Sequence, residues 1–226
     1  NDVYPDGVHT ELSGHYHKIV QAYFNQFVGI AEKGNRELPS VFRDQITKMG
    51  SYSAASMRPS GNGLNNNEAH MDYILDTILE DAGKSGRDDW LYIATYGKQG
   101  KSPDFTSSFY PYAGQLIMRD NWSRKANWGF FDVGPWGTSH QHNDKLHLSV
   151  SAFGADILVD AGRYIYENGP VRSYFTGSRG HNIILVDGQG QNKYPGETKE
   201  PITEDKFQIT DTHDFAIGTF DAGFGP

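Results

Sequence analysis

The chain has 226 residues, a length that allows one large or two ordinary domains with a buried core. Its formal charge of −8 argues against a nucleic-acid-binding surface, because neutralising phosphates requires clustered Lys and Arg. The absence of cysteine excludes disulfide bonds, and no run of about 18 apolar residues, the length that spans a membrane, occurs.

Helical periodicity dominates the chain as far as about residue 96. Apolar side chains recur at intervals of three and four from about Ser13 to Lys33, and Gly34 follows as a C-terminal stop. A second helix is expected to begin near Leu38 and Pro39, because proline is favoured in the first turn. Further helices are predicted at about 68–81 and 88–95.

Gly, Ser and Pro replace this periodicity between Gly97 and Pro111, which indicates a domain boundary or linker. Beyond it, short runs of branched and aromatic residues alternate with Gly-containing turns, a pattern typical of an antiparallel sandwich. We therefore predict an α+β protein with a helical domain at 1–105 and an antiparallel β-sandwich at 106–226 that stops early. The predicted strands are 115–119, 127–133, 146–153, 156–159, 182–186, 206–210 and 215–220.

Histidine and aspartate side chains gather between residues 134 and 187 at spacings that suit a metal site. If the segment containing His140 and His142 is a strand, both imidazoles project to the same face, because strand side chains alternate. From the spacing we expect His142, Asp160 and His181 to bind zinc, with the two imidazoles close together and Asp160 buried. The alternative is that all of them are ordinary polar residues near turns.

A second metal motif fits the same segment in part. Gly134, five residues and then His140-x-His142 resemble the first motif of the cupin barrels, but the glutamate of that motif would fall at Leu146 or His147. His147 could replace this glutamate, which leaves a cupin-like metal enzyme that uses the three histidines as an alternative. The other role for His147 is to occupy one face of a predicted strand.

The combination of motifs resembles the heparinase II/III family of polysaccharide lyases, and the resemblance covers most of the chain. It implies the last helices of an (α/α) toroid followed by an antiparallel β-sandwich, with an acidic polysaccharide or oligosaccharide held between them. The matching stretches are Pro5-Asp6-Gly7 with Glu11-x-Ser13 and Tyr16-His17, the run from Gly114 to Asp120, Asp132-Val-Gly-Pro135, His140-x-His142-x-Asp144, Asp160-Ala-Gly162 with Tyr166, and Tyr174 seven residues before His181-Asn182, ending in Val186-Asp187-Gly188.

The resemblance also implies β-elimination at a uronic acid, in which a base removes the proton beside the carboxylate and an acid protonates the departing glycosidic oxygen. Carried over by position, Tyr16 is the catalytic tyrosine and His140 is the histidine that lines the site. The same comparison implies that His142, Asp160 and His181 hold a structural Zn²⁺ beside the active site. It further implies a bacterial protein that is periplasmic or secreted.

The residue types suit these roles. A free tyrosine has a pKa of about 10, so Tyr16 needs cationic neighbours to act as a base at neutral pH but needs none to act as an acid. His140 can accept or share a proton near neutrality. Tyr174 is a candidate for a second phenol at the site, and Arg179 for pairing with a uronate carboxylate. Without the resemblance, core packing would be the better assignment for Tyr16.

The Asn-His element with which the family neutralises the carboxylate should precede Tyr16, and it is missing here, as are most helices of a toroid. We therefore expect these residues to be an internal portion of a longer enzyme, which could be inactive without the missing parts. A third interpretation is a non-catalytic carbohydrate-binding sandwich. A lyase releases an unsaturated uronate, an oxygenase of cupin type consumes oxygen, and a binding module does neither.

Overall fold

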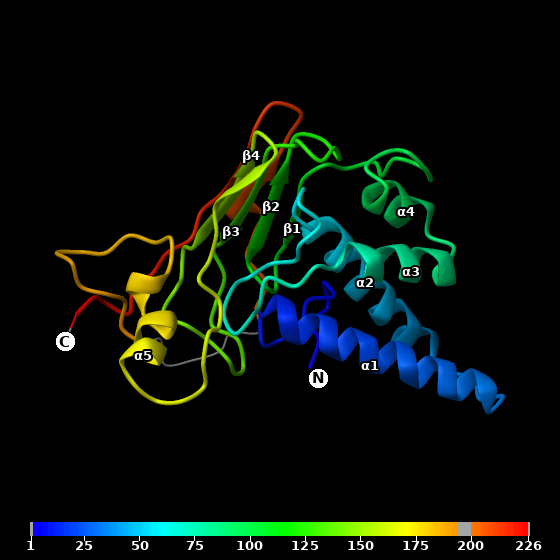
Figure 1. The fold of residues 1–226 in the computed structure, drawn as a ribbon, viewed down its shortest axis with the longest axis horizontal. Coiled ribbons are helices and arrows are strands. Elements are labelled where there is room, and N and C mark those ends of the chain that lie inside the picture. Colours follow the sequence, from blue (N-terminus) through cyan, green and yellow to red (C-terminus); the bar gives the residue numbers. More distant parts are fainter. Residues whose placement is uncertain (1, 194–199, 226) are drawn as a thin grey trace.

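The computed structural model describes residues 2–193 and 200–225. It combines helices with antiparallel strands, which confirms the α+β prediction. Helices α1 to α4 lie to one side of the sheet and α5 lies to the other (Figure 1). The helices are α1 (Gly14–Lys33), α2 (Ser40–Ser56), α3 (Leu75–Ser85), α4 (Asp88–Ala94) and α5 (Pro170–Thr176), with short 3-10 turns at Ser178–Gly180 and Glu204–Lys206.

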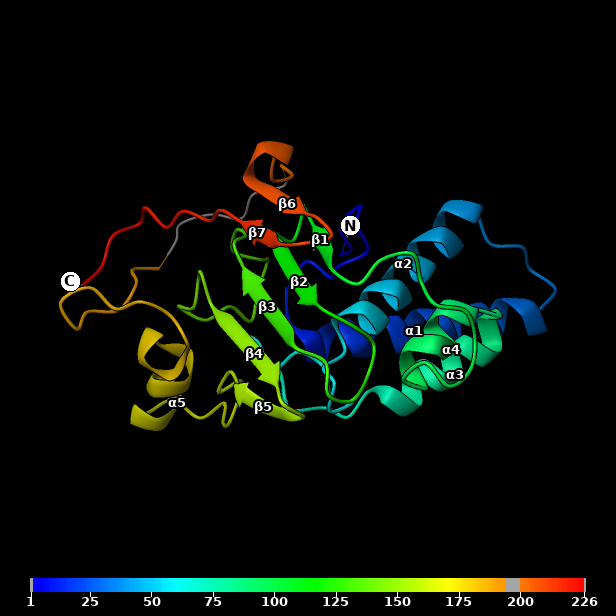
Figure 2. The same cartoon turned by 90° about the horizontal axis from the view of Figure 1, so that it is seen from above.

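The main sheet has five strands in sequence order, and every neighbouring pair is antiparallel. A separate two-stranded hairpin lies beside its first two strands (Figure 2), where the rings of Phe109 and Phe207 stack at 3.9 Å. The strands of the main sheet are β1 (Ser108–Tyr110), β2 (Gln115–Arg119), β3 (Trp128–Asp132), β4 (Leu148–Ala152) and β5 (Ala155–Leu158), and the hairpin consists of β6 (Phe207–Ile209) and β7 (Asp214–Ala216).

One hydrophobic core is shared by the helical part and the sheet. Tyr52 of α2 packs in it with Ile117 of β2 and Phe130 of β3, and the N-terminal segment adds Leu12. The Tyr52 hydroxyl donates a hydrogen bond of 2.6 Å to the Gln115 side chain. A second core forms among α2, α3 and α4. The two predicted domains are therefore packed together as well as joined in sequence.

Helix α1 forms where its periodicity predicts, but part of its apolar stripe is not buried. Tyr23 and Ile30 are 65% and 61% exposed, whereas the buried positions include His17 and Gln21. The second half of α1 extends away from the sheet (Figure 1), and the rings of Phe24 and Phe27 there contact Phe42 of α2. The periodicity identified the helix correctly, but it does not identify the side of the helix that packs.

Several predicted elements differ from the structure. The helix predicted at 68–81 begins only at Leu75, because Gly63 donates to the Asp72 carbonyl and Asn62 pairs with Tyr73, which holds the preceding residues in a loop. Residues 182–186 form no named strand, and Ile184 there is 79% exposed. Strand β1 lies in the predicted linker, and α5 lies in a segment where no helix was expected.

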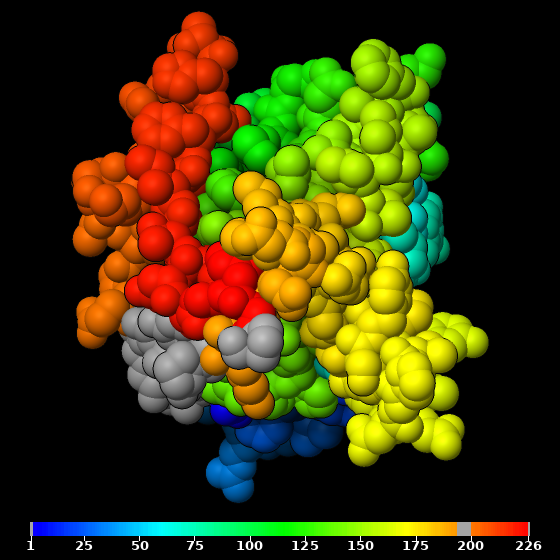
Figure 3. All heavy atoms as spheres, turned by 90° about the vertical axis from the view of Figure 1, so that its left-hand side faces the viewer, coloured from blue at the N-terminus to red at the C-terminus, as the bar shows by residue number. Residues whose placement is uncertain are grey.

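The end of the molecule that carries α5 is built from segments distant in sequence. Figure 3 shows the last described residues lying against the segment just before residue 193. The amide of Asn192 donates to the Gly223 carbonyl, and the amide of Gly225 donates to the Gly190 carbonyl, both at 2.9 Å. Among the described helices, none has the length and apolar character needed to cross a membrane.

Candidate active site

Three rings from distant segments meet at the start of α1. The Tyr16 hydroxyl lies 2.6 Å from the Tyr166 hydroxyl, which comes from the segment after β5. The Tyr16 ring also stacks on the imidazole of His140, with centroids 4.1 Å apart and planes at 17°. Tyr16 thus faces two proton-exchanging groups and is only half-buried, so it is not a core-packing residue.

Glu11 orients the imidazole of His140. Its carboxylate lies 2.9 Å from Nδ1 of His140, and the Ser139 hydroxyl donates to the same carboxylate at 3.0 Å. A carboxylate only accepts hydrogen bonds, so Nδ1 carries the proton and Nε2 of the neutral ring is left as an acceptor. Glu11 lies in a stretch that carries the family resemblance, but the sequence assigns it no role, because that role depends on a contact across 129 residues.

The two histidines of the His140-x-His142 motif do not lie on one face, which corrects the strand-based expectation. Residues 140–142 form no strand, and the backbone turns at His140 with φ 58°. His140 faces Tyr16, whereas His142 is fully buried with its Nε2 3.1 Å from Glu68 Oε1. The cupin-like set of His140, His142 and His147 is therefore divided among different partners.

The phenol of Tyr16 keeps its proton at neutral pH. Burial and then the hydrogen bond with Tyr166 raise the pKa of Tyr16 to about 12, although the nearby charge of Arg163 acts in the opposite direction. A hydroxyl of this acidity is protonated over the whole physiological range. Tyr16 is therefore suited to donate a proton, and His140 is the neighbouring group with a free acceptor nitrogen.

A buried group of metal-ligating side chains lies among the predicted zinc ligands. Asp160 Oδ2 is 2.8 Å from His181 Nδ1 and 3.1 Å from His147 Nδ1, and donor atoms of these three residues lie within 4.8 Å of one another. The ring of His142 lies next to His181, with centroids 5.2 Å apart. Asp160 and His181 are thus close together and buried as the spacing predicts, with His147 as an unexpected neighbour.

Several potential metal-ligating atoms in and beside this group have no hydrogen-bond partner within the described chain, as a cation site requires. Among the described residues, Nδ1 of His142, Nε2 of His181 and both carboxylate oxygens of Asp144 are buried without a hydrogen-bond partner. Both nitrogens of His147, by contrast, are already engaged, Nε2 by the Ser149 hydroxyl at 2.8 Å. Buried polar atoms without partners are costly unless something binds them, and a metal ion would do so.

Glu68 adds a second feature typical of metal-binding histidines. Its carboxylate contacts Nε2 of His142 and also pairs with Arg172, which together outweigh burial and lower the pKa of Glu68 to about 2. Imidazoles that bind metals usually donate their other N–H to such a carboxylate. This contact leaves Nδ1 of His142 as the nitrogen available for a metal.

The segment after β5 is fixed to the loop before α3. Asn65 donates to the Asp160 carbonyl and the amide of Arg163 donates to the Ala69 carbonyl, both at 2.8 Å. Gly162 adopts φ 58° here, and a side chain at this position would overlap Asn65 and Ala69. The backbone approach is thus tight enough to set where Tyr166 lies relative to Tyr16.

Tyr174 and Arg179 lie elsewhere. Both line a hollow of about 490 Å³ beside α5, and neither Tyr16 nor His140 is among its lining residues. Tyr174 is 53% exposed, and Nη2 of Arg179 donates to the Gly188 carbonyl at 2.5 Å. Tyr174 and Arg179 therefore border the same hollow, which Tyr16 and His140 do not line.

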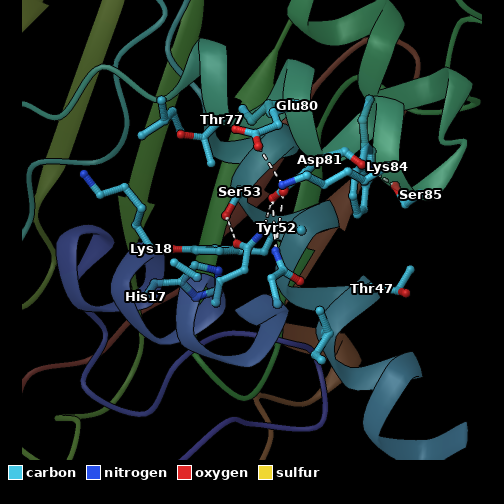
Figure 4. A pocket seen from close by; sticks show the side chains of 18 of the residues that line it. His17, Lys18, Thr47, Tyr52, Ser53, Thr77, Glu80, Asp81, Lys84 and Ser85 are labelled. Carbon is cyan, nitrogen blue, oxygen red and sulfur yellow. Dashed lines mark hydrogen bonds and ion pairs between the residues drawn. The ribbon is translucent and has the colours of Figure 1, made fainter. Parts of the chain in front are cut away.

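Another hollow, of about 730 Å³, lies among α1, α2 and α3 (Figure 4). Its polar groups satisfy one another: Gln21 donates to Asp81 at 2.9 Å and accepts from Ser53 at 2.7 Å. At its inner end Nε2 of His17 lies 3.1 Å from the Met49 carbonyl. The named groups of this hollow are therefore paired within the protein, and Tyr16, His140 and Tyr166 do not line it.

Comparison with protein-family models gives two matches. Residues 102–217 match the model described as heparinase II/III-like, C-terminal. Residues 1–74 match the model described as heparinase II/III N-terminus. The two matches leave only residues 75–101 and the last nine residues uncovered.

Two characterised relatives are similar over most of the chain. A heparin-sulfate lyase of Pedobacter heparinus is 26% identical, and the alignment covers 83% of this chain and 30% of the relative. A heparin-sulfate lyase of Bacteroides stercoris is 25% identical, with 92% of this chain and 33% of the relative covered. The chain thus spans about a third of the length of these relatives.

Solved structures give the same correspondence. A heparinase III superposes with a TM-score of 0.78 at 27% identity, covering 90% of this chain and 33% of that chain. A mutant of the heparan sulfate lyase HepC from Pedobacter heparinus gives a TM-score of 0.77 at 24% identity, covering 84% and 31%. The match to HepC shows a shared fold. The match to the heparinase III adds a higher sequence identity to the shared fold.

Proposed function

Because this chain belongs to the heparinase II/III-like family, we propose that it is part of a polysaccharide lyase that cleaves a uronic-acid-containing glycosaminoglycan by β-elimination. The observation that carries the proposal is the contact of Tyr16 with both Tyr166 and His140. The similarity to heparin-sulfate lyases supports a glycosaminoglycan as the substrate class. Alginate is the second uronic-acid polymer to be tested.

The geometry supports a separate task for each group. Nε2 of His140 removes the proton from the carbon beside the uronate carboxylate, while Glu11 holds Nδ1 and stabilises the imidazolium that forms. The released electron pair forms the new carbon–carbon double bond as the glycosidic bond breaks. The departing oxygen then takes the phenolic proton of Tyr16, whose hydroxyl lies 2.6 Å from that of Tyr166.

We also propose that a zinc ion is held by His142, Asp160 and His181, with Asp144 close by. The unpartnered buried atoms of His142, His181 and Asp144 support a metal ion at this place. Asp160 would have to exchange a contact with Gly162 or His181 for the ion, as His147 would have to exchange its contact with Ser149. Such an ion would fix the loop before β4 and the segment after β5, which carry His140 and Tyr166. His140 and Tyr16 retain the proton transfers.

A periplasmic or secreted location forms part of the same proposal, because glycosaminoglycans and alginate occur outside cells. Fractionation of the source cells, with detection of the intact protein, tests it. Recovery with the cytoplasmic fraction alone would contradict the location without affecting the chemistry.

The decisive experiment uses the intact protein and the variant Tyr16→Phe, which removes only the hydroxyl. We expect the wild type to release an ultraviolet-absorbing unsaturated uronate from heparan sulfate, and the variant to be slower by about 100-fold or more. Tyr23→Phe, on the exposed side of the same helix, is the matched control and should retain full activity.

Metal content measured on the same samples separates chemistry from folding. Tyr16→Phe should keep the zinc content of the wild type, since Tyr16 is not among the proposed ligands. Equal loss of zinc and activity would show that Tyr16 serves the fold. If the wild-type protein releases no unsaturated product from any uronic-acid polymer, the proposed function is wrong.

A further inference from the structure

Two guanidinium groups flank the ring of Tyr166. The guanidinium carbon of Arg163 lies 4.3 Å from the ring centroid, and that of Arg172 lies 5.4 Å from it. The hydroxyl of the same ring is bonded to Tyr16. The ring of Tyr166 therefore lies between Tyr16, the proposed proton donor, and two positively charged side chains.

The charges of these two arginines are compensated differently. Arg172 pairs with the buried carboxylate of Glu68. Within the described part of the chain, no carboxylate lies within 4 Å of the Arg163 guanidinium, and its contact is with the imidazole of His70. Burial and the charge of Arg163 lower the pKa of His70, which disfavours a positive charge on that imidazole. A full positive charge thus remains at Arg163.

Each of the two arginines also has an N–H group that makes no hydrogen bond to the described part of the chain. In the described residues, Nε of Arg163 and Nη1 of Arg172 are buried atoms with no hydrogen-bond partner. Leaving such donors unpaired is unfavourable in a purely structural arrangement. Tyr166 is 50% exposed and both arginine side chains are partly exposed, that of Arg172 by 19%, so the two guanidinium groups border a surface that a ligand can reach.

We propose that Arg163 and Arg172 form a binding site for an oxyanion of the glycan, a carboxylate or a sulfate on a sugar next to the bond that is cleaved. Planar guanidinium groups bind such oxyanions through paired N–H donors, and the Tyr166 ring holds both groups in place. The inference rests on the proposed function, which it extends from the reaction to the recognition of the substrate's charge.

Binding of a heparan sulfate oligosaccharide to the intact protein, measured by titration calorimetry in a Tyr16→Phe background to prevent cleavage, tests the site. We expect Arg163→Gln to weaken binding about tenfold, the loss of one charged hydrogen-bonding group. Arg124→Gln is the matched control, because Arg124 likewise lies 4.4 Å over a tyrosine ring, that of Tyr96. It should change the affinity less than twofold.

Two chemically altered ligands identify the oxyanion. If the site binds sulfate, the Arg163→Gln effect disappears with the desulfated oligosaccharide, and if it binds carboxylate, the effect disappears with the carboxyl-reduced one. An affinity equal to that of Arg124→Gln for the unaltered oligosaccharide overturns the inference, as does a wild-type protein that binds no acidic oligosaccharide.

Arg163→Lys keeps the charge and serves if Arg163→Gln does not fold. We expect it to bind at least threefold more weakly than the wild type, and wild-type affinity would overturn the inference. The outcome is separable from that of the lyase proposal. Binding that depends on Arg163 without any cleavage by the wild type contradicts only the lyase, whereas cleavage with binding independent of Arg163 contradicts only this site.

Discussion

His17 is an imidazole that the fold keeps neutral. The amide of His9 donates to its Nδ1 at 3.2 Å, and its Nε2 donates to the Met49 carbonyl at 3.1 Å, so a second ring proton has no place. Burial lowers the pKa of His17 to about 4. Between this value and the ordinary one of about 6.5, the unfolded chain binds a proton that the folded chain does not.

The lowered pKa of His17 makes part of the free energy of unfolding depend on pH. This contribution, up to about 3 kcal/mol, is fully present above pH 6.5 and is lost as the pH falls to about 4. Urea denaturation of the wild type at pH 7 and pH 5 measures the loss. In His17→Gln we expect a smaller difference between the two pH values, whereas His213→Gln, on the exposed β6–β7 hairpin, should behave like the wild type. An equal pH effect in wild type and His17→Gln would contradict the assignment.

The sequence indicates some individual site residues and not others, for a physical reason. Asp160 and His181 follow strands or turns that their local sequence makes recognisable, and the structure brings them together. Glu11 and Tyr166 lie in stretches that carry the family resemblance, but the sequence gives them no role, because their contacts with His140 and Tyr16 span 129 and 150 residues. The surrounding sequence of Glu68 does not mark it either, since its partner His142 is 74 residues away. The turn at His140 was missed because local β propensity cannot show that tertiary contacts divide two neighbouring histidines.

At the scale of the elements, two helical glycines differ only in what surrounds them. A Cβ added at Gly50 of α2 would overlap the ring of Trp90 in α4, whereas one added at Gly29 of α1 would meet nothing within 4 Å. Alanine is the better helix former by about 1 kcal/mol where space allows. The close packing of α2 against α4 therefore requires glycine at position 50, whereas position 29 can accept a side chain.

Thermal unfolding of the two alanine variants measures this difference. We expect Gly29→Ala to stabilise the protein by up to about 1 kcal/mol and Gly50→Ala to destabilise it by about 1–3 kcal/mol, because overpacking displaces the helix or the indole. The contact would be unimportant if both substitutions raised the melting temperature.

Elements with a strong local signal are the ones that sequence analysis predicts best. Helices α1, α2 and α4 and strands β2 and β3 lie within a few residues of their predicted bounds, since each has a clear periodicity or a run of branched and aromatic residues. The start of α3, the α5 helix and the irregular stretch at 182–186 were not predicted. Their conformation depends on tertiary hydrogen bonds, such as that from Asn182 to the Val159 carbonyl.

The whole molecule unfolds as a unit if the shared core governs its stability. Tyr52 of α2 donates to the side-chain oxygen Oε1 of Gln115 of β2 in that core, and within the described chain Nε2 of Gln115 has no hydrogen-bond partner. Tyr52→Phe leaves the buried Gln115 oxygen unpaired and should destabilise the protein by about 1–3 kcal/mol. Tyr23→Phe, at an exposed position, should change the stability by less than about 0.5 kcal/mol.

Circular dichroism at helical wavelengths and tryptophan fluorescence follow the two parts of the molecule separately. We expect both signals to shift together in Tyr52→Phe and to give a single transition. Two separate transitions, with only one of them moved by the substitution, would mean that the helices and the sheet unfold independently.

The meeting of Tyr16, His140 and Tyr166 also bears on how members of this family can be recombined. Tyr16 comes from the helical side of the junction between helices and sheet, and His140 and Tyr166 come from the other side. A chimera that exchanges one side with a relative therefore inherits part of the proposed reaction centre from each parent, and its success requires matched contacts across the junction.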